Sequence, residues 1–200
     1  IDTLLTQLGS SNLQIQTGSG GTTDDGDITV STAITAPGNN FDLTLQAIDD
    51  IILDADIDFS ANTDTGNLSL TADSGNTNTK GAISGAGTIL MGGGDLSLSA
   101  GIGIGTSGTA IATQGVGSLA AESSSGGIFI TNSTSGDMSI GASGVSATTS
   151  GDVEITNNAG SIVIDDGGIT GQADVTLSAN TSISAANTTN AAEIDVNGDL

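Results

Sequence analysis

A short polar residue followed by an apolar–x–apolar triplet recurs along this chain of 200 residues. The polar residue is Asn or Asp, and a Gly usually stands just ahead of it. The copies begin at Asn12, Asp27, Asp42, Asn67, Asp95, Asp137, Asp152, Asp174 and Asp199, the last of which is cut off after Leu200. Repeated turn-plus-strand units are typical of solenoids, in which each unit buries its apolar face only by stacking on its neighbours. The repeat therefore predicts a rod.

The better copies contain three short strands separated by turns rich in Gly, Asn and Asp. The strands expected in two of them are residues 43–45, 51–53 and 57–59, and residues 153–155, 161–164 and 168–170. Three strands and three turns in roughly 22 residues make one coil of a parallel β-helix. We therefore expect an all-β fold, a single β-solenoid over residues 1–200 with about eight or nine coils. No helices are expected, because strong helix formers other than Ala and Leu are scarce.

The spacing of the copies is loose. A degenerate copy at Ser118-Leu119-Ala120-Ala121 divides the longest gap, and most spacings then lie near twenty-odd residues. The steps of 15 residues at the start do not fit a three-sided coil, so residues 1–40 are expected to be irregular or to form shorter coils, and residues 41–200 regular ones. Because Asp199 opens an incomplete copy, the chain is expected to be a segment of a longer protein.

Alternation within each triplet predicts which side chains lie inside the coil. The two outer residues, such as Leu43 and Leu45, point inward, and the middle residue faces solvent. The expected core consists of columns of Leu, Ile and Val, with Phe59 and Phe129 filling wider gaps.

The net charge of −22 includes a single Lys or Arg, which is Lys80. A chain without a cationic patch is not expected to bind nucleic acid or anionic membrane surfaces, and no apolar run is long enough for membrane insertion. The catalytic inventory is nearly empty, since the chain has no His, Tyr, Trp or Cys. Asp54 and Asp56 are the pair best placed for glycoside hydrolysis, but a solvated acidic face explains them better, and we expect no enzyme.

Acidic turns are the sequence's best candidates for a cofactor, because Ca²⁺ is bound by six to eight oxygen ligands. No EF-hand spacing is present, so no dedicated site and no cofactor are expected, and weak binding of Ca²⁺ at these turns is the alternative. The candidate ligands are Asp24, Asp25, Asp27, Asp49, Asp50, Asp54, Asp56, Asp165 and Asp166.

The Asp that opens each repeat raises an electrostatic problem. Coils stack about 4.8 Å apart, and two carboxylates at that distance repel by about 1 kcal/mol even in bulk water. Asn12 and Asn67 occupy the same place in the repeat, which indicates that an oxygen rather than a charge is required. We predict that this oxygen accepts backbone N–H groups at the turn entering the strand. The alternative is that Ca²⁺ offsets the repulsion at some coils.

Residues 66–72, 94–101 and 173–179 have the form Gly/Ala-Asx-apolar-x-apolar-Ser/Thr-Ala. These runs resemble the repeats of filamentous-haemagglutinin-type exoproteins, and the similarity covers roughly residues 27–200. The resemblance implies a right-handed parallel β-helix, export by two-partner secretion, and work as an adhesin shaft or surface filament. The family's Asn-Pro-Asn-Gly secretion motif is absent, since the one Pro is Pro37, so the chain is expected to be shaft rather than secretion module.

The expected function is that of a structural and adhesive rod of a secreted or cell-surface bacterial protein. Its partners would be further repeats or other copies at the solenoid ends, and a receptor that the sequence does not name. One alternative is a self-assembling extracellular filament whose copies stack end to end. Another is a solenoid face that binds Ca²⁺, a glycan or ice, suggested by outward Ser and Thr in successive triplets.

Overall fold

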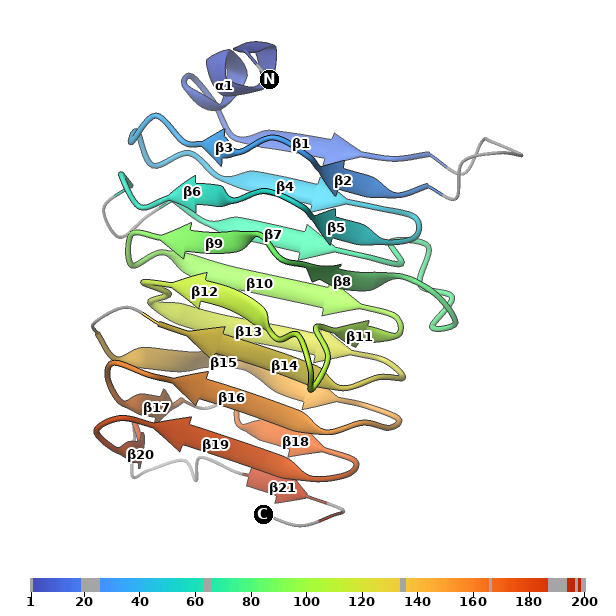
Figure 1. Ribbon diagram of the computed structural model, residues 1–200, viewed down its shortest axis with the longest axis vertical. Helices are drawn as coiled ribbons and strands as arrows, with labels where there is room; N and C mark the ends of the chain where they lie inside the picture. The colour runs from blue at the N-terminus through green and yellow to red at the C-terminus, as the bar shows by residue number, and fades with distance from the viewer. Residues whose placement is uncertain are drawn as a thin grey trace.

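In the computed structural model of this chain, short parallel strands stack in layers from the N-terminal to the C-terminal end (Figure 1). The structure describes residues 2–18, 26–62, 66–133, 136–165, 167–186, 194–196 and 198. The expected all-β parallel β-solenoid is confirmed, with turns of about 24 residues. The right-handed winding stays a prediction.

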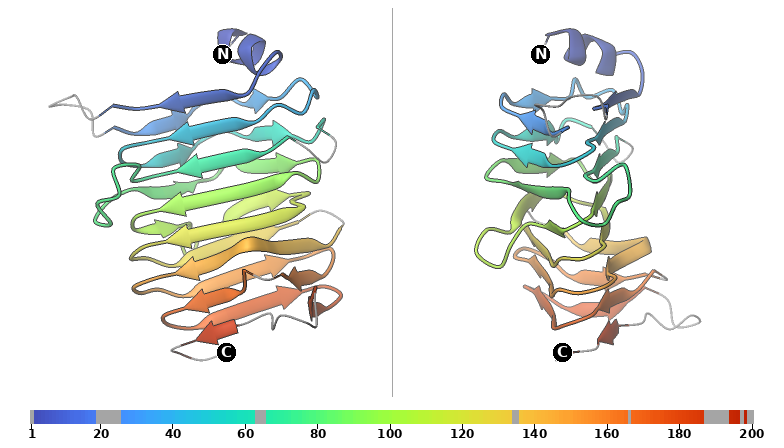
Figure 2. Two further views of the ribbon diagram at one scale, coloured as in Figure 1. Left: turned by 180° about the vertical axis from the view of Figure 1, so that it is seen from behind. Right: turned by 90° about the vertical axis from the view of Figure 1, so that its right-hand side faces the viewer.

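The strands form two sheets that face each other across a narrow core (Figure 2). The first sheet follows the order β1 (Leu13–Gln16), β4 (Leu43–Gln46), β7 (Leu68–Thr71), β10 (Asp95–Ala100), β13 (Ser118–Ser123), β15 (Met138–Ala147), β17 (Ile162–Ile164) and β20 (Ile183–Ala185). Beside this path, β18 (Ile169–Gly171) pairs with β15, and β21 (Ile194–Val196) pairs with β18. Each strand pairs in parallel with the next turn's strand, so each turn contacts mainly its neighbours.

The second sheet has two arms that meet at one strand. One arm contains β2 (Ile28–Val30), β5 (Ile51–Leu53), β8 (Ala82–Gly85) and β11 (Gly103–Ile104), and the other contains β3 (Ile34–Thr35), β6 (Ile57–Phe59), β9 (Thr88–Met91) and β12 (Ile111–Gln114). Both arms reach β14 (Ile128–Asn132), which continues into β16 (Val153–Asn157) and β19 (Val175–Ala179). Early turns thus carry two strands on the second sheet, whereas the turn that begins with β16 carries two, β17 and β18, on the first.

This exchange explains the loose spacing of the repeats. The copies at Asn12, Asp42, Asn67 and Asp95 enter the first sheet, whereas those at Asp27, Asp152 and Asp174 enter the second. A step of 15 residues is therefore half a turn. Asn12 and Asp42 are hydrogen-bonded across 30 residues, so the turn that begins at Asn12 is longer than expected rather than shorter. An apolar–x–apolar triplet has the same pattern in either sheet. The sequence alone therefore did not distinguish the copies that enter the first sheet from those that enter the second.

The buried columns follow the predicted alternation. Leu43 and Leu45 are at most 1% exposed, and their column continues through Leu68 and Leu70 of the next turn. The degenerate copy at Ser118 forms β13 in register with β10, as expected. Phe59 is fully buried. The placement of Phe129 in the core was wrong, because Phe129 lies between the buried Ile128 and Ile130 and therefore points outward.

The expectation of no helices was wrong at one place, where α1 (Asp2–Leu8) precedes β1. Leu8 is fully buried, and Leu4 and Leu5 pack against the core cluster. Leu8 lies three residues after Leu5 and four after Leu4, and residues at these spacings share one helical face, so this short helix covers part of the N-terminal end of the core, above β1 in Figure 1. Among the described residues, no helix has the length and apolar character needed to cross a membrane.

Candidate functional site

Three of the predicted metal ligands lie together where the turns enter the second sheet. Asp27, Asp49 and Asp50 each bring a carboxylate oxygen within 4.8 Å of the other two. Asp27 precedes β2, and Asp49 and Asp50 precede β5, which pairs with β2. The parallel register therefore stacks two acidic turns directly on each other.

The three carboxylates already have partners within the protein. Oδ1 of Asp27 accepts the backbone N–H of Asp50 at 3.0 Å, and Oδ1 of Asp50 accepts that of Ala82 at 2.7 Å. Oδ1 of Asp49 accepts the N–H of Gly81 at 3.0 Å. Lys80 places its Nζ 3.6 Å from Oδ2 of Asp49. The cluster thus holds backbone groups of the next turn, and the chain's single Lys supplies a counter-charge.

The other predicted ligands are not part of this cluster. Asp54 and Asp56 are exposed in the turn between β5 and β6, and Oδ1 of Asp56 accepts the N–H of Thr88 at 2.7 Å. Asp165 follows β17 on the first sheet, where its backbone N–H donates to Ile140. Asp24, Asp25 and Asp166 lie outside the described residues.

The same hydrogen bond recurs at most of the repeated Asx positions. In each case the side-chain Oδ1 of one turn accepts the backbone N–H of the residue stacked on it in the next turn. The donor–acceptor pairs are Asp42 to Asn12 (3.0 Å), Asn67 to Asp42 (3.0 Å), Asp95 to Asn67 (3.1 Å), Asp50 to Asp27 (3.0 Å), Ser161 to Asp137 (2.8 Å) and Asp174 to Asp152 (3.2 Å). The prediction that this oxygen accepts backbone N–H groups is confirmed, and we call the arrangement the Asx ladder.

The Asx ladder also limits its own repulsion in the first sheet. There Asn12, Asp42, Asn67 and Asp95 stack in this order, so amides alternate with carboxylates. The two carboxylates are then two layers apart, about 9.6 Å at the usual strand spacing. In the second sheet Asp27 and Asp50 are adjacent, and the ion pair of Lys80 with Asp49 lies beside them. Compensation by Ca²⁺ stays a prediction.

Sequence reasoning missed Asp73, a buried carboxylate that accepts three hydrogen bonds. Asp73 is 5% exposed, and its Oδ1 accepts both the N–H (2.9 Å) and the hydroxyl (2.8 Å) of Thr77. Oδ2 accepts the N–H of Asn78 at 2.5 Å. Burial raises the pKa of Asp73, but these hydrogen bonds and the charge of Lys80 outweigh it, so the pKa lies below its usual value. Asp73 therefore organises the loop between β7 and β8, and the Asp-Ser-Gly-Asn run that starts there signals such a turn.

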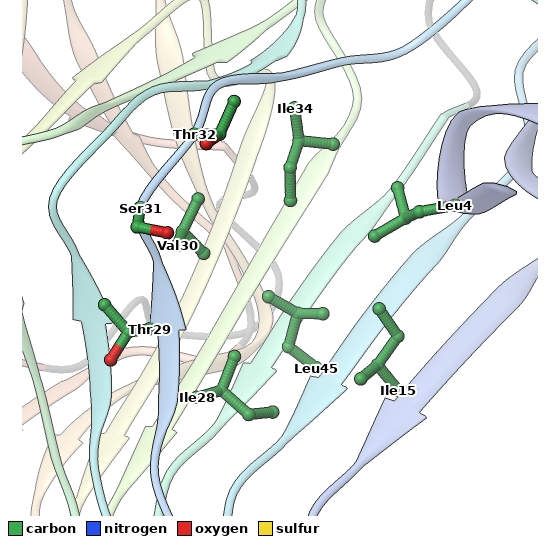
Figure 3. A pocket seen from close by; sticks show the side chains of 9 residues that line it. All are labelled: Leu4, Ile15, Ile28, Thr29, Val30, Ser31, Thr32, Ile34 and Leu45. Atoms are coloured by element: carbon green, nitrogen blue, oxygen red, sulfur yellow. The ribbon is translucent and has the colours of Figure 1, made fainter. Parts of the chain in front are cut away.

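An apolar hollow of about 330 Å³ lies at the N-terminal end of the core (Figure 3). Inward side chains of the first turns line it, together with Leu4 of α1 and the hydroxyl residues Thr29, Ser31 and Thr32. The aliphatic lining is formed by Ile15, Ile28, Val30, Ile34 and Leu45. These aliphatic residues continue the buried columns of the later turns, so the hollow is the N-terminal end of the core beside α1. Among the described residues, its lining has none of the titratable groups that catalysis requires.

Comparison of this chain with protein-family models, curated proteins and solved structures finds no significant match.

Proposed function

We propose that this chain is a segment of the shaft of a secreted or cell-surface bacterial protein, a structural and adhesive rod without catalytic activity. The observation that carries the proposal is the parallel pairing that runs from β1 through β20 in the first sheet and from β2 through β19 in the second. Repeats stacked in this way form a quasi-one-dimensional body whose length grows with the number of turns.

The features that distinguish a shaft from a globular domain are mechanical. Neighbouring turns are joined by both sheets, by the buried columns and by the Asx ladder. A force along the sheets' stacking direction therefore acts on many hydrogen bonds at once. The net charge of −22 keeps such a surface soluble and discourages association with other acidic surfaces.

The proposed export, the attachment to a receptor and the absence of catalytic activity have separate support. The resemblance of residues 27–200 to filamentous-haemagglutinin-type repeats supports export by two-partner secretion and attachment to a receptor. The absence of catalytic activity is supported by composition, because the whole chain has no His, Tyr, Trp or Cys. It is also supported by the way in which Asp27, Asp50 and Asp56 are used, since each accepts a backbone N–H of the next turn.

Immunogold electron microscopy tests the proposal. Antibodies raised against this chain should label thin extended structures on intact source cells, and cells lacking the gene should lose both the label and part of their adhesion. Label that appears only after permeabilisation would contradict a surface rod. Unchanged adhesion with surface label present would reduce the proposal to a structural rod.

The alternative is a filament whose copies stack end to end. It is favoured by apolar side chains at both ends: the hollow of Figure 3, and a hollow of about 410 Å³ lined by Val175, Leu177, Ile183 and Ile194. Ile183 is 45% exposed. Filaments that lengthen with protein concentration in negative-stain images of the isolated chain would favour this alternative, and single rods of constant length would exclude it.

A further inference from the structure

A polar hollow of about 250 Å³ lies on the outward face of the first sheet, where β10, β13 and β15 run side by side. Its floor includes Ala120, one of the smallest side chains on that face. Five polar side chains stand around this methyl group, from three different strands: Ser97, Ser99, Glu122, Ser143 and Ser146. We call this arrangement the Glu122 bowl.

The strand register places these side chains around Ala120. Ala120 pairs with Ser97 of β10, and Glu122, two residues further along β13, lies on the same face. Glu122 pairs with Ser99 on one side and with Ser146 on the other. Because paired strands lie about 4.8 Å apart, the carboxylate has a hydroxyl-bearing neighbour on both flanking strands.

An irregularity in β15 forms the remaining wall. Leu119 pairs with Ile140 but Ala121 pairs with Val145, so residues 141–144 of β15 lie opposite Ala120 alone. Ser143 within this bulge is exposed and lines the bowl. Gly144 has a φ of 71°, and a side chain there would collide with the carbonyl of Gly167 in the next turn. The bulge is therefore held in shape by its packing, which fits the frequent occurrence of bulges where a side chain must be re-aimed.

The polar groups of the bowl are not used within the protein. In the part of the chain that the structure describes, none of the five side chains makes a hydrogen bond or ion pair with another residue. The chain's single Lys or Arg side chain, Lys80, pairs instead with Asp49 in the turn that precedes β5. Glu122 is thus a carboxylate with hydroxyls beside it and no side-chain cation.

We propose that the Glu122 bowl binds a primary alkylammonium group. An ammonium presents three N–H donors, and the bowl offers a carboxylate and serine hydroxyls as acceptors, with a methyl floor for the attached carbon. The net charge of −22 attracts cations and repels anions. A single carboxylate is a poor basis for Ca²⁺, which takes six to eight oxygen ligands. Binding at this face of the first sheet is independent of an adhesive function.

The test is a titration of the ¹⁵N-labelled chain with ethylammonium chloride, followed by amide chemical shifts, with NaCl at equal ionic strength as the reference. We expect saturable shifts centred on Ala120, Glu122 and Gly144. Glu122→Gln should weaken binding by about tenfold, because a hydrogen bond to a charged acceptor becomes a neutral one. Ala120→Leu fills the floor and should abolish the local shifts. Putrescine, which carries two ammonium groups, distinguishes a polyamine from a monoamine ligand by its tighter binding.

Glu154→Gln is the matched control, since Glu154 is an exposed, outward residue of β16 on the second sheet. It removes the same charge and should change the affinity less than twofold. Equal weakening by the two variants, or shifts spread over both sheets, would overturn the proposal in favour of a general electrostatic attraction. Ca²⁺ that saturates the same amides and displaces ethylammonium would overturn it in favour of a metal site.

Discussion

Asn12 and Asp42 are joined by two hydrogen bonds across one turn of the solenoid. Oδ1 of Asn12 accepts the backbone N–H of Asp42, and Nδ2 of Asn12 donates to Oδ2 of Asp42, each at 3.0 Å. Asp42 in turn accepts the N–H of Asn67 at 3.0 Å. The amide thus supplies both a donor and an acceptor, which a carboxylate cannot do. Alternation of Asn and Asp satisfies backbone donors in each turn while separating the charges.

The position of Asn67 between two Asp residues allows this account to be tested. Asn67→Asp keeps the acceptor for the Asp95 N–H but brings three carboxylates into adjacent layers. We expect a loss of about 2 kcal/mol in the free energy of unfolding at low salt, about 1 kcal/mol for each of the two new carboxylate pairs. Most of this loss should disappear near 1 M salt, where screening acts within about 3 Å. Urea denaturation at both salt concentrations measures it.

Asn67→Ala is the control for that experiment, because it removes the acceptor without adding charge. Its cost, about 1 kcal/mol for a lost side-chain cap, should be the same at both salt concentrations. A loss in Asn67→Asp that does not respond to salt would show that charge separation does not determine the choice of Asn at this position.

The loop organised by Asp73 should make the protein sensitive to acid. The pKa of Asp73 is lowered in the folded state, so its stabilising contribution is present above the ordinary Asp pKa of about 3.9. That contribution is lost as the pH falls from this value through the lower folded pKa. Asp73→Asn retains a residue that tolerates the φ of 60° found here, and it should reduce the fall in melting temperature between pH 5 and pH 2.

Glu122→Gln is the appropriate comparison, since Glu122 is exposed and has no hydrogen-bond partner among the described residues. This variant removes one carboxylate without removing a hydrogen bond of the folded protein, so the difference between the two variants isolates the hydrogen bonds of Asp73. If Asp73→Asn left the fall in melting temperature between pH 5 and pH 2 unchanged, the hydrogen bonds to Thr77 and Asn78 would not contribute to acid stability.

Much of the fold follows from alternation and turn residues. The predicted strands at 43–45, 51–53 and 57–59 correspond to β4, β5 and β6, and those at 153–155, 161–164 and 168–170 to β16, β17 and β18. The pattern of short strands with inward Leu, Ile and Val, separated by Gly and Asx turns, is compatible with few folds other than a parallel β-solenoid. The sequence did not predict which copies of the repeat enter the first sheet and which enter the second. A triplet has the same pattern in both sheets and does not indicate which other triplet it will stack on.

The remaining errors have local causes. Helix α1 was missed because only Leu4, Leu5 and Leu8 carry its periodicity, over a single turn and a half. The bulge at residues 141–144 was missed because Gly and Ser in a strand also read as an ordinary turn. The acidic cluster was only partly found: Asp27, Asp49 and Asp50 meet through register, whereas the role of Lys80 depends on a loop that the repeat pattern does not describe.

The outward position of Phe129 gives a prediction with an internal control. Phe59→Ala removes a fully buried ring and should cost about 3–5 kcal/mol in the free energy of unfolding, as is usual for Phe truncation in a core. Phe129→Ala removes the same side chain from the partly exposed outer face of β14 and should cost less than about 1.5 kcal/mol. Comparable losses in urea denaturation would contradict the assignment of Phe129 to the outer face.

The ion pair between Lys80 and Asp49 should have a small effect on stability and a clear dependence on salt. The Lys80 and Asp49 side chains are partly exposed, at 37% and 20%, and the Nζ–Oδ2 distance is 3.6 Å. Lys80→Gln should therefore lower the free energy of unfolding by less than about 1 kcal/mol at low salt and by nothing measurable at high salt, as urea denaturation would show.

Removing divalent cations with EDTA should leave the melting temperature unchanged, because backbone N–H groups already bind one oxygen each of Asp27, Asp49 and Asp50. A fall on EDTA treatment that Ca²⁺ alone restores would instead show that a cation, and not Lys80, balances the stacked carboxylates.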